Sequence, residues 1–314
     1  MACVGALIAA CGEDDESATT DASRPAPAAS EFPAVDGRTL EQIYADSEPG
    51  ELVVSPASSV FTEGKNRAPF GLFTVGREQI TDADVAIYTA PGPGTPAEGP
   101  FTASVESLAT EPAFVARSTA ADPDAGKAVY VTDLELDRPG AWRLVALVRR
   151  DGETTAVRAP SIEVSREDPI LAPGDAAPRV HTPTAEDVGG DLSQIDTRVP
   201  PSTMHDQDLA EVLGKEPAVL VFATPALCQS RTCGPVVDIA EQVKRDHADD
   251  AAFIHMEIYE NNDPNDGLRP QVRAYGLATE PWVFVIDREG RIETRFEGAV
   301  SVDELEAAVE RVSQ

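Results

Sequence analysis

The second half of the chain alternates apolar segments of strand type with amphipathic segments of helix type, and this pattern limits its folds more than any other feature. Residues 181–314 contain the order β-α-β-α-β-β-α, which predicts an α/β domain. The last helix begins at an N-cap Ser301, and Glu304 completes a capping box. The apolar runs are PAVLVFAT, AFIHMEIYE and PWVFVID, and the longest amphipathic run is GPVVDIAEQVKRDHA.

Residues 50–166 have a different pattern, because short segments with partial period-2 alternation are separated by Gly, Pro and Asp turns. About seven such segments in about 115 residues predict an all-β sandwich of immunoglobulin-like architecture. In the segment that follows Pro139-Gly140, Trp142, Leu144 and Ala146 alternate toward a core. Since this region has no Cys, His or Met cluster, we interpret it as a spacer or protein-contact module rather than a metal site.

Two segments are too polar or too rich in proline to fold alone. Residues 12–49 are acidic and rich in Ala, Pro and Ser, which predicts a disordered tether. Residues 167–180 read EDPILAPGDAAPRV and predict a linker. The expected fold class is therefore multidomain, with an N-terminal all-β sandwich and a C-terminal α/β domain.

The charge of the chain excludes one class of partner. There are 55 acidic and 25 basic side chains, for a net charge of −30. Such a surface repels phosphate backbones, so we expect no nucleic-acid binding. No Walker sequence or dinucleotide fingerprint is present, and we expect no cofactor.

The N-terminus has the pattern of an export signal. Residues 1–11 end in VGALIAAC, which resembles the bacterial lipobox: an aliphatic residue, two small ones and a cysteine that receives a lipid, here Cys11. No Lys or Arg precedes the apolar run, from which we suspect a start codon placed too late. The alternative is a frayed apolar tail. With no run of 18 apolar residues, we expect a lipid anchor on the outer face of the bacterial plasma membrane.

The folded part of the chain carries a single cysteine pair. Cys228 and Cys233 are separated by four residues, directly after an apolar run and before a helical one. Outside the cytoplasm such a pair is expected to be oxidised at least part of the time. From position alone it is a redox centre, a structural disulfide or a metal clip.

Two stretches of the second half resemble the thioredoxin fold, and in particular extracytoplasmic, membrane-tethered thioredoxin-like proteins. They are AVLVFATPALC and YGLATEPWVFVIDREGRIETRFEGAVSVDELEAAV, and the resemblance covers about residues 175–314. The run CGPVV is also similar to the family's Cys-Gly-Pro-Cys motif. The resemblance implies thiol–disulfide exchange with protein disulfide or dithiol clients.

The spacing Cys-x4-Cys departs from the family's Cys-x-x-Cys. The two cysteines can therefore be aligned with the family's motif in two ways, which we call overlays. The motif overlay places Cys233 at the family's first cysteine, whereas the distance from the preceding strand places Cys228 there. We prefer the second, which makes Cys228 the attacking thiol and Cys233 the resolving one. The acid that many thioredoxins bury on the central strand is absent, and Leu227 replaces their tryptophan. Arg231 is a candidate to stabilise the thiolate.

The resemblance also places Glu280-Pro281 at the family's cis-proline. It implies that the backbone groups of Thr279 and Glu280, beside Pro281, pair with an extended substrate chain. A carboxylate at Glu280 would raise the pKa of a nearby thiol.

Three hypotheses follow for the cysteine pair. The first is a thiol–disulfide oxidoreductase, and the second is a non-catalytic binding or structural lipoprotein with a permanent disulfide. The third is metal handling, which we disfavour because no histidine lies in the loop just before the final β-β-α unit, so we expect no metal; a peroxidase is weaker still. We predict surface positions for two of the four histidines, His205 and His247, and a strand position for His255. The fourth histidine is His181.

Overall fold

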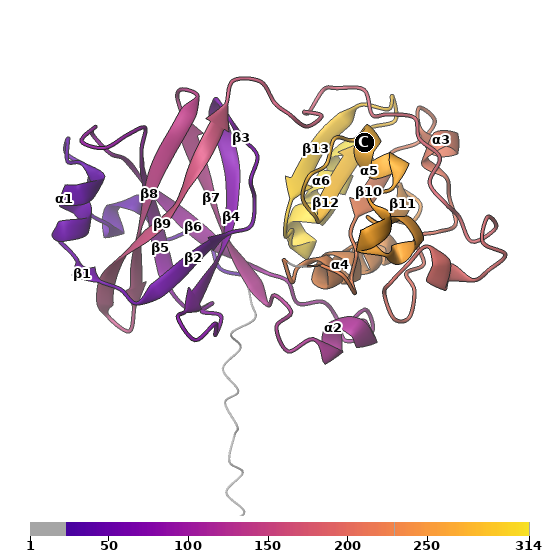
Figure 1. Cartoon of the computed structure of the whole chain (residues 1–314), viewed down its shortest axis with the longest axis horizontal. Helices are drawn as coiled ribbons and strands as arrows, with labels where there is room; N and C mark the ends of the chain where they lie inside the picture. Colours follow the sequence, from indigo (N-terminus) through magenta and orange to yellow (C-terminus); the bar gives the residue numbers. More distant parts are fainter. Residues whose placement is uncertain (1–22, 229, 314) are drawn as a thin grey trace, which may run out of the picture.

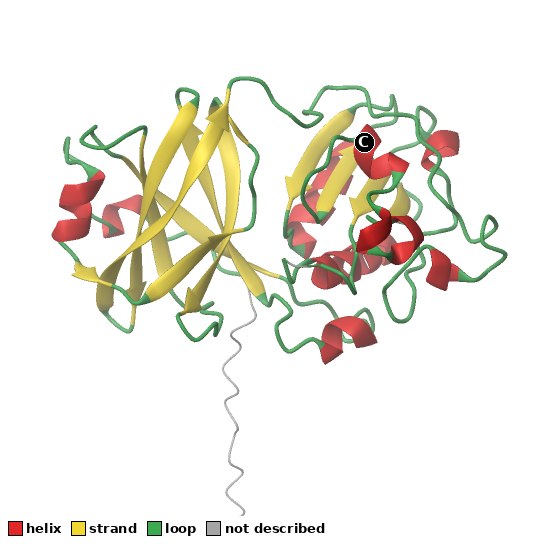
Figure 2. Ribbon diagram, viewed as in Figure 1, coloured by secondary structure: helices red, strands yellow, loops and turns green. Residues whose placement is uncertain are grey.

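The computed structural model describes residues 23–228 and 230–313 and has two units that lie side by side (Figure 1). The first unit is built almost entirely of strands, and the second has a central sheet with helices on both faces (Figure 2). The predicted signal and its Cys11 lie outside the described residues. Within the described part, no helix has the length and apolar character needed to cross a membrane.

In the first unit each of the seven predicted strand segments is a strand, and two short strands are added. The strands are β1 (Glu48–Pro49), β2 (Leu52–Pro56), β3 (Phe61–Thr62), β4 (Gly64–Thr74), β5 (Asp84–Ala90), β6 (Glu98–Ser107), β7 (Ala128–Leu136), β8 (Gly140–Arg150) and β9 (Glu153–Ser165). The helices are η1 (Ala29–Glu31), α1 (Leu40–Ala45) and α2 (Arg117–Ala121), the last of which lies in the connection between β6 and β7.

The strands pair in the order β1-β9-β8-β5-β6-β7-β4-β2, and β3 also pairs with β9. All pairs are antiparallel except those of β1 and β3 with β9. Strand β6 pairs with β5 through its first part and with β7 through its last four residues, so it joins two layers. Trp142 and Ala146 lie fully buried in the core between them, as their alternation predicted.

The prediction of a disordered tether over residues 12–49 is wrong for residues 23–49. Phe32, Leu40 and Ile43 are buried and pack against Tyr88 and other side chains of β5 and β8. Helix α1 is closed at its start by a capping box of Thr39 and Gln42. The polar composition of the segment predicted disorder, although three of its apolar side chains are enough to fix it to the sheet. Burial of each side chain of this size contributes about 1.5–3 kcal/mol to the stability of the fold.

The second unit confirms the predicted order β-α-β-α-β-β-α. Its main elements are β10 (Ala218–Phe222), α4 (Cys233–His247), β11 (Ala252–Met256), α5 (Pro270–Ala274), β12 (Trp282–Ile286), β13 (Ile292–Glu297) and α6 (Val302–Val312). Shorter elements are η2 (Leu192–Gln194), α3 (Leu209–Val212), η3 (Glu260–Asn262) and η4 (Pro264–Asp266). The predicted capping box of Ser301 and Glu304 is present at the start of α6.

The sheet of the second unit has the order β11-β10-β12-β13, with β10 parallel to β11 and antiparallel to β12. On β10, Val219 and Val221 face the core that includes α4 and α6, while Leu220 and Phe222 face the core that includes α3 and α5. Both faces of the strand are covered, which is why its sequence is a continuous apolar run. The arrangement is thioredoxin-like, as the resemblance implies.

The predicted linker, residues 167–180, packs along the second unit. Ile170 and Ala177 are buried in its core, and Asp168 pairs with Arg295 of β13 at 2.5 Å. Proline prevents a regular strand here. The apolar side chains and backbone hydrogen bonds nevertheless fix the segment to the sheet edge.

The two units share an interface that contains both apolar and charged groups. Leu108 and Val129 of the first unit belong to the same buried cluster as helix α4 of the second. Arg67 of β4 donates two hydrogen bonds to Glu304 at 2.8 and 2.9 Å, and both side chains are mostly buried. The first unit is therefore packed directly against the second rather than held at a distance from it (Figure 1).

Candidate functional site

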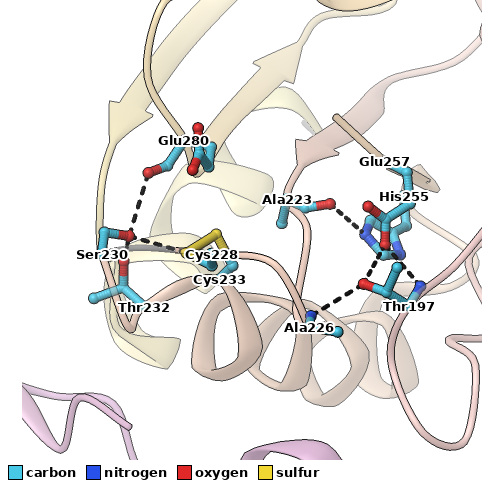
Figure 3. The surroundings of a disulfide bond; sticks show 10 residues. All are labelled: Thr197, Ala223, Ala226, Cys228, Ser230, Thr232, Cys233, His255, Glu257 and Glu280. Atoms are coloured by element: carbon cyan, nitrogen blue, oxygen red, sulfur yellow. Dashed lines mark hydrogen bonds between the residues drawn. A yellow bond between two sulfur atoms is a disulfide. The ribbon is translucent and has the colours of Figure 1, made fainter. Parts of the chain in front are cut away.

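The two cysteines of the second unit form a disulfide between the loop that follows β10 and the first residue of α4 (Figure 3). Their Cα atoms are 6.0 Å apart, in the usual range for a disulfide. Cys233 is fully buried, whereas Cys228 is half-buried. A reactant from solution therefore reaches Cys228 first. Helix α4 begins at Cys233, the cysteine that the motif overlay aligns with the family's first cysteine.

Ser230 connects the loop between the two cysteines to the loop that contains Glu280 and Pro281. Its hydroxyl lies 3.1 Å from Cys228 Sγ and 2.9 Å from Thr232 Oγ1, and it donates to the backbone carbonyl of Glu280 at 3.3 Å (Figure 3). The cysteine pair and the residue that precedes Pro281 are thus neighbours in space, although the chain between them is long.

The Glu280–Pro281 peptide bond is cis, as predicted. Thr279 is fixed beside it, because its hydroxyl donates to Glu297 at 2.8 Å and accepts from the Trp282 indole at 3.0 Å. Glu280 is half-buried, and burial raises the pKa of its carboxyl. This raised pKa weakens the tendency of Glu280 to carry a negative charge beside the sulfur atoms.

A buried polar centre, formed by Asp196, His205 and His255, was not predicted from the sequence. It lies next to the loop that joins β10 to α4 and contains Cys228, which we call the cysteine loop. Asp196 accepts from His205 Nε2 at 3.0 Å and from His255 Nδ1 at 3.3 Å. His205 is 3% exposed, so the prediction that it lies on the surface is wrong. His255 lies on strand β11, as predicted.

The charges of this centre follow from its contacts. Burial alone would lower the pKa of His255, but the carboxylate of Asp196 outweighs it and raises the pKa to about 9. Burial alone would raise the pKa of Asp196, but the charge of His255 and hydrogen bonds from both histidines outweigh it and lower that pKa. At neutral pH, Asp196 and His255 are therefore a buried ion pair.

The three ligand atoms of Asp196, His205 and His255 lie within 4.8 Å of one another, close enough to share one cation. Both ring nitrogens of His255 already face acceptors, however, because Nε2 lies 3.1 Å from the carbonyl of Ala223. A protonated imidazole satisfies both acceptors, so the ion pair accounts for the geometry. The expectation that the chain binds no metal stays a prediction.

The buried centre holds the cysteine loop at two points (Figure 3). The first is the bond from His255 to the carbonyl of Ala223, directly after β10. The second is Thr197, whose hydroxyl accepts from the amide of Ala226 at 3.1 Å and donates to buried Glu257 at 2.6 Å. The one sequence signal for this centre was the presence of two ionisable residues, His255 and Glu257, in the otherwise apolar run AFIHMEI.

Helix α4 is held by a second buried ion pair. Arg198 donates to Asp238 at 2.8 Å, and the two side chains are 7% and 2% exposed. Burial raises the pKa of Asp238, although the charge of Arg198 opposes the shift. Arg198 also donates to the carbonyl of Phe114, and the amide of Ala116 donates to Asp238 at 3.1 Å. The first unit thus reaches the first half of the helix that begins at Cys233.

No family model and no curated protein matches this chain. Two solved structures are similar to part of it: a candidate thiol:disulfide interchange protein DsbE from Chlorobium tepidum, and a thiol:disulfide interchange protein of the thioredoxin family from Chlorobium tepidum TLS. The first is 17% identical with a TM-score of 0.34, over 46% of this chain and 99% of that one. The second is 18% identical with a TM-score of 0.30, over 48% and 100%. At these values the likenesses assign no activity to this chain.

Proposed function

We propose that the chain is a membrane-tethered, extracytoplasmic thioredoxin-like protein that exchanges thiols and disulfides through Cys228 and Cys233. The observation that carries the proposal is the difference between the two sulfur positions. Cys228 is half-buried and Cys233 is fully buried at the first residue of a 15-residue helix. An exchanging pair needs one cysteine that a client can reach and one that only its partner can reach.

The chemistry is a two-electron exchange. In the reduced protein, the thiolate of Cys228 attacks a client disulfide, forms a mixed disulfide and releases one client thiolate. The thiolate of Cys233 then attacks Cys228 Sγ, which releases the second client thiol and closes the disulfide of this structure. The dithiol is oxidised and the client disulfide is reduced; the reverse sequence oxidises a client dithiol.

Three features of the site serve this chemistry. The N-terminal end of α4 favours negative charge, so it favours the thiolate of either cysteine. The segment of Thr279, Glu280 and Pro281 would pair with an extended client chain, and the carbonyl of Glu280 accepts from Ser230, whose hydroxyl lies 3.1 Å from Cys228 Sγ. Burial raises the pKa of Glu280, which reduces the opposition of its carboxyl to a nearby thiolate.

The same proposal includes the placement of the chain. Lipidation of Cys11 would hold it at the outer face of a bacterial plasma membrane, where disulfides persist. We assign residues 50–166 to an immunoglobulin-like sandwich and residues 181–314 to the thioredoxin-like domain. The strand orders β2-β4-β7-β6 and β5-β8-β9 support the first assignment, because immunoglobulin-like sandwiches have this arrangement.

The test is the reduction potential of the pair in the full chain, measured against dithiothreitol or glutathione by thiol alkylation and mass. We expect a value between about −120 and −270 mV, within the range of known exchangers. Cys233→Ser should then accumulate mixed disulfides on Cys228, whereas the control Cys228→Ser should not. A disulfide that resists reduction below about −300 mV would favour the alternative, a non-catalytic binding module whose disulfide is structural. The features that favour that alternative are the Cys-x4-Cys spacing and the absence of an acid on the central strand.

A further inference from the structure

The loop between the two cysteines contains a residue in an unfavourable backbone conformation. Arg231 has a φ of 64°, in the left-handed region. Residues other than glycine, asparagine and aspartate seldom adopt this region, because the Cβ atom approaches the following carbonyl oxygen. Such a conformation persists where surrounding contacts fix it, and it is frequent at functional sites.

The contacts that fix Arg231 come from the first unit. They lie in the connection between β6 and β7, residues 108–127. The amide of Gly126 donates to the carbonyl of Arg231 at 2.9 Å. The carboxylate of Asp124 pairs with the Arg231 guanidinium at 3.1 Å, in a partly exposed position. Backbone and side chain of the same residue are thus both held by a segment more than a hundred positions earlier.

The same connection also contacts the helix beside the buried cysteine. A Cβ atom added to Gly234, the residue after Cys233, would lie 2.8 Å from Thr119 Oγ1. A Cβ atom added to Gly126 would lie 3.4 Å from Thr232 Cγ2. The connection therefore packs closely against the cysteine loop on the side of Cys233.

Residues of the first unit also contact the segment that precedes Pro281, through Glu297. Glu297, which accepts from Thr279, also accepts from the hydroxyl of Ser59 at 2.7 Å and from the amides of Ser59 and Val60 at 2.9 Å. Contacts from the first unit thus meet both sides of the cysteine pair.

We propose that the connection between β6 and β7 is a working part of the redox site, and that Asp124 and Gly126 are positioning residues for the dithiol. They hold Arg231 in the left-handed conformation in which Cys228 and Cys233 meet. This inference rests on the proposed exchange function. When the disulfide is reduced, the two sulfur atoms no longer have to lie within bonding distance, and Arg231 is free to leave the left-handed region. The first unit therefore stabilises the disulfide over the dithiol and lowers the reduction potential of the pair.

Two substitutions at one position separate the backbone effect from the loss of the side chain. Arg231→Ala and Arg231→Gly both remove the ion pair with Asp124, but only alanine retains the steric cost of the left-handed region. In the full chain equilibrated with dithiothreitol, we expect the Arg231→Ala disulfide to be about fivefold easier to reduce than the Arg231→Gly disulfide. That ratio corresponds to a potential higher by about 20 mV.

The contact from the first unit is tested by Asp124→Asn, which should make the disulfide about twofold easier to reduce than in the unmodified chain. Its matched control is Asp137→Asn, which removes the carboxylate of an exposed Asp–Arg pair within the first unit and should change nothing. Unfolding temperatures of all variants, measured in parallel, show that the fold is intact.

Equal potentials for Arg231→Ala and Arg231→Gly, or for Asp124→Asn and the unmodified chain, would overturn this inference and leave the exchange function standing. A pair that resists dithiothreitol in every variant, the unmodified chain included, would overturn both. The two failures are therefore distinguishable in one set of titrations.

Discussion

The buried ion pair of Asp196 and His255 predicts a loss of stability as the pH rises from about 6.5 to 9. An unfolded histidine has a pKa of about 6.5, whereas that of His255 in the folded protein is about 9. Because the folded pKa is the higher one, the proton stabilises the fold fully below pH 6.5, and this contribution is lost as the pH rises through 9. A difference of about 2.5 units corresponds to about 3 kcal/mol.

The measurement is urea denaturation of the full chain at several pH values between 6 and 9.5. In this window most aspartate and glutamate side chains are already ionised and lysine is still charged, and the other histidine whose pKa is raised is His181, through its hydrogen bond to Asp208. His255→Gln should be less stable at pH 6 and should lack most of the loss above pH 6.5, the remainder coming from His181. The control His247→Gln changes a histidine at the last residue of α4 and should retain the loss. A free energy of unfolding that stays constant from pH 6.5 to 9, or that falls equally in His255→Gln, would refute the reasoning.

Three further predictions concern the rest of the fold. Ile43→Ala should lower the free energy of unfolding by about 2–5 kcal/mol in urea denaturation, because Ile43 is 1% exposed; an unchanged midpoint would restore the tether interpretation. Arg198→Ala should cost about 3–5 kcal/mol by the same measurement, because it leaves Asp238 buried without its partner; a loss below 1 kcal/mol would contradict this. Burial raises the pKa of Glu280, so its ionisation destabilises the fold above the ordinary glutamate pKa of about 4.3. Glu280→Gln should therefore raise the thermal midpoint more at pH 7 than at pH 4, and an equal change at both would exclude this cause.

Local patterns in the sequence were enough to predict most of the strands and helices. The apolar run of β10 and the amphipathic run of α4 determined their own secondary structure, since the period of the side chains matches the element. The capping box of Ser301 and Glu304 was also predictable, because both partners lie within one helical turn.

Segments of mixed composition were predicted less well. Residues 23–49 and 167–180 are rich in polar residues and proline, and their composition indicates a tether and a linker. A few apolar side chains, such as Phe32 and Ile170, nevertheless find complementary surfaces on the two cores. Composition averages over a segment, whereas burial depends on single side chains and on the surface they meet.

The sequence by itself determined the order of the elements and the cysteine pair, and the resemblance to the thioredoxin fold implied the cis-proline before the last two strands. Only the tertiary structure decided what surrounds the cysteines. Asp196 and His255 are 59 positions apart, and their bond forms because an irregular segment lies against the edge of β11. Asp124 meets Arg231 because two units pack together. A sequence pattern records periodicity within one element, but an ion pair between distant segments depends on where the whole chain places each side chain, which no local pattern contains.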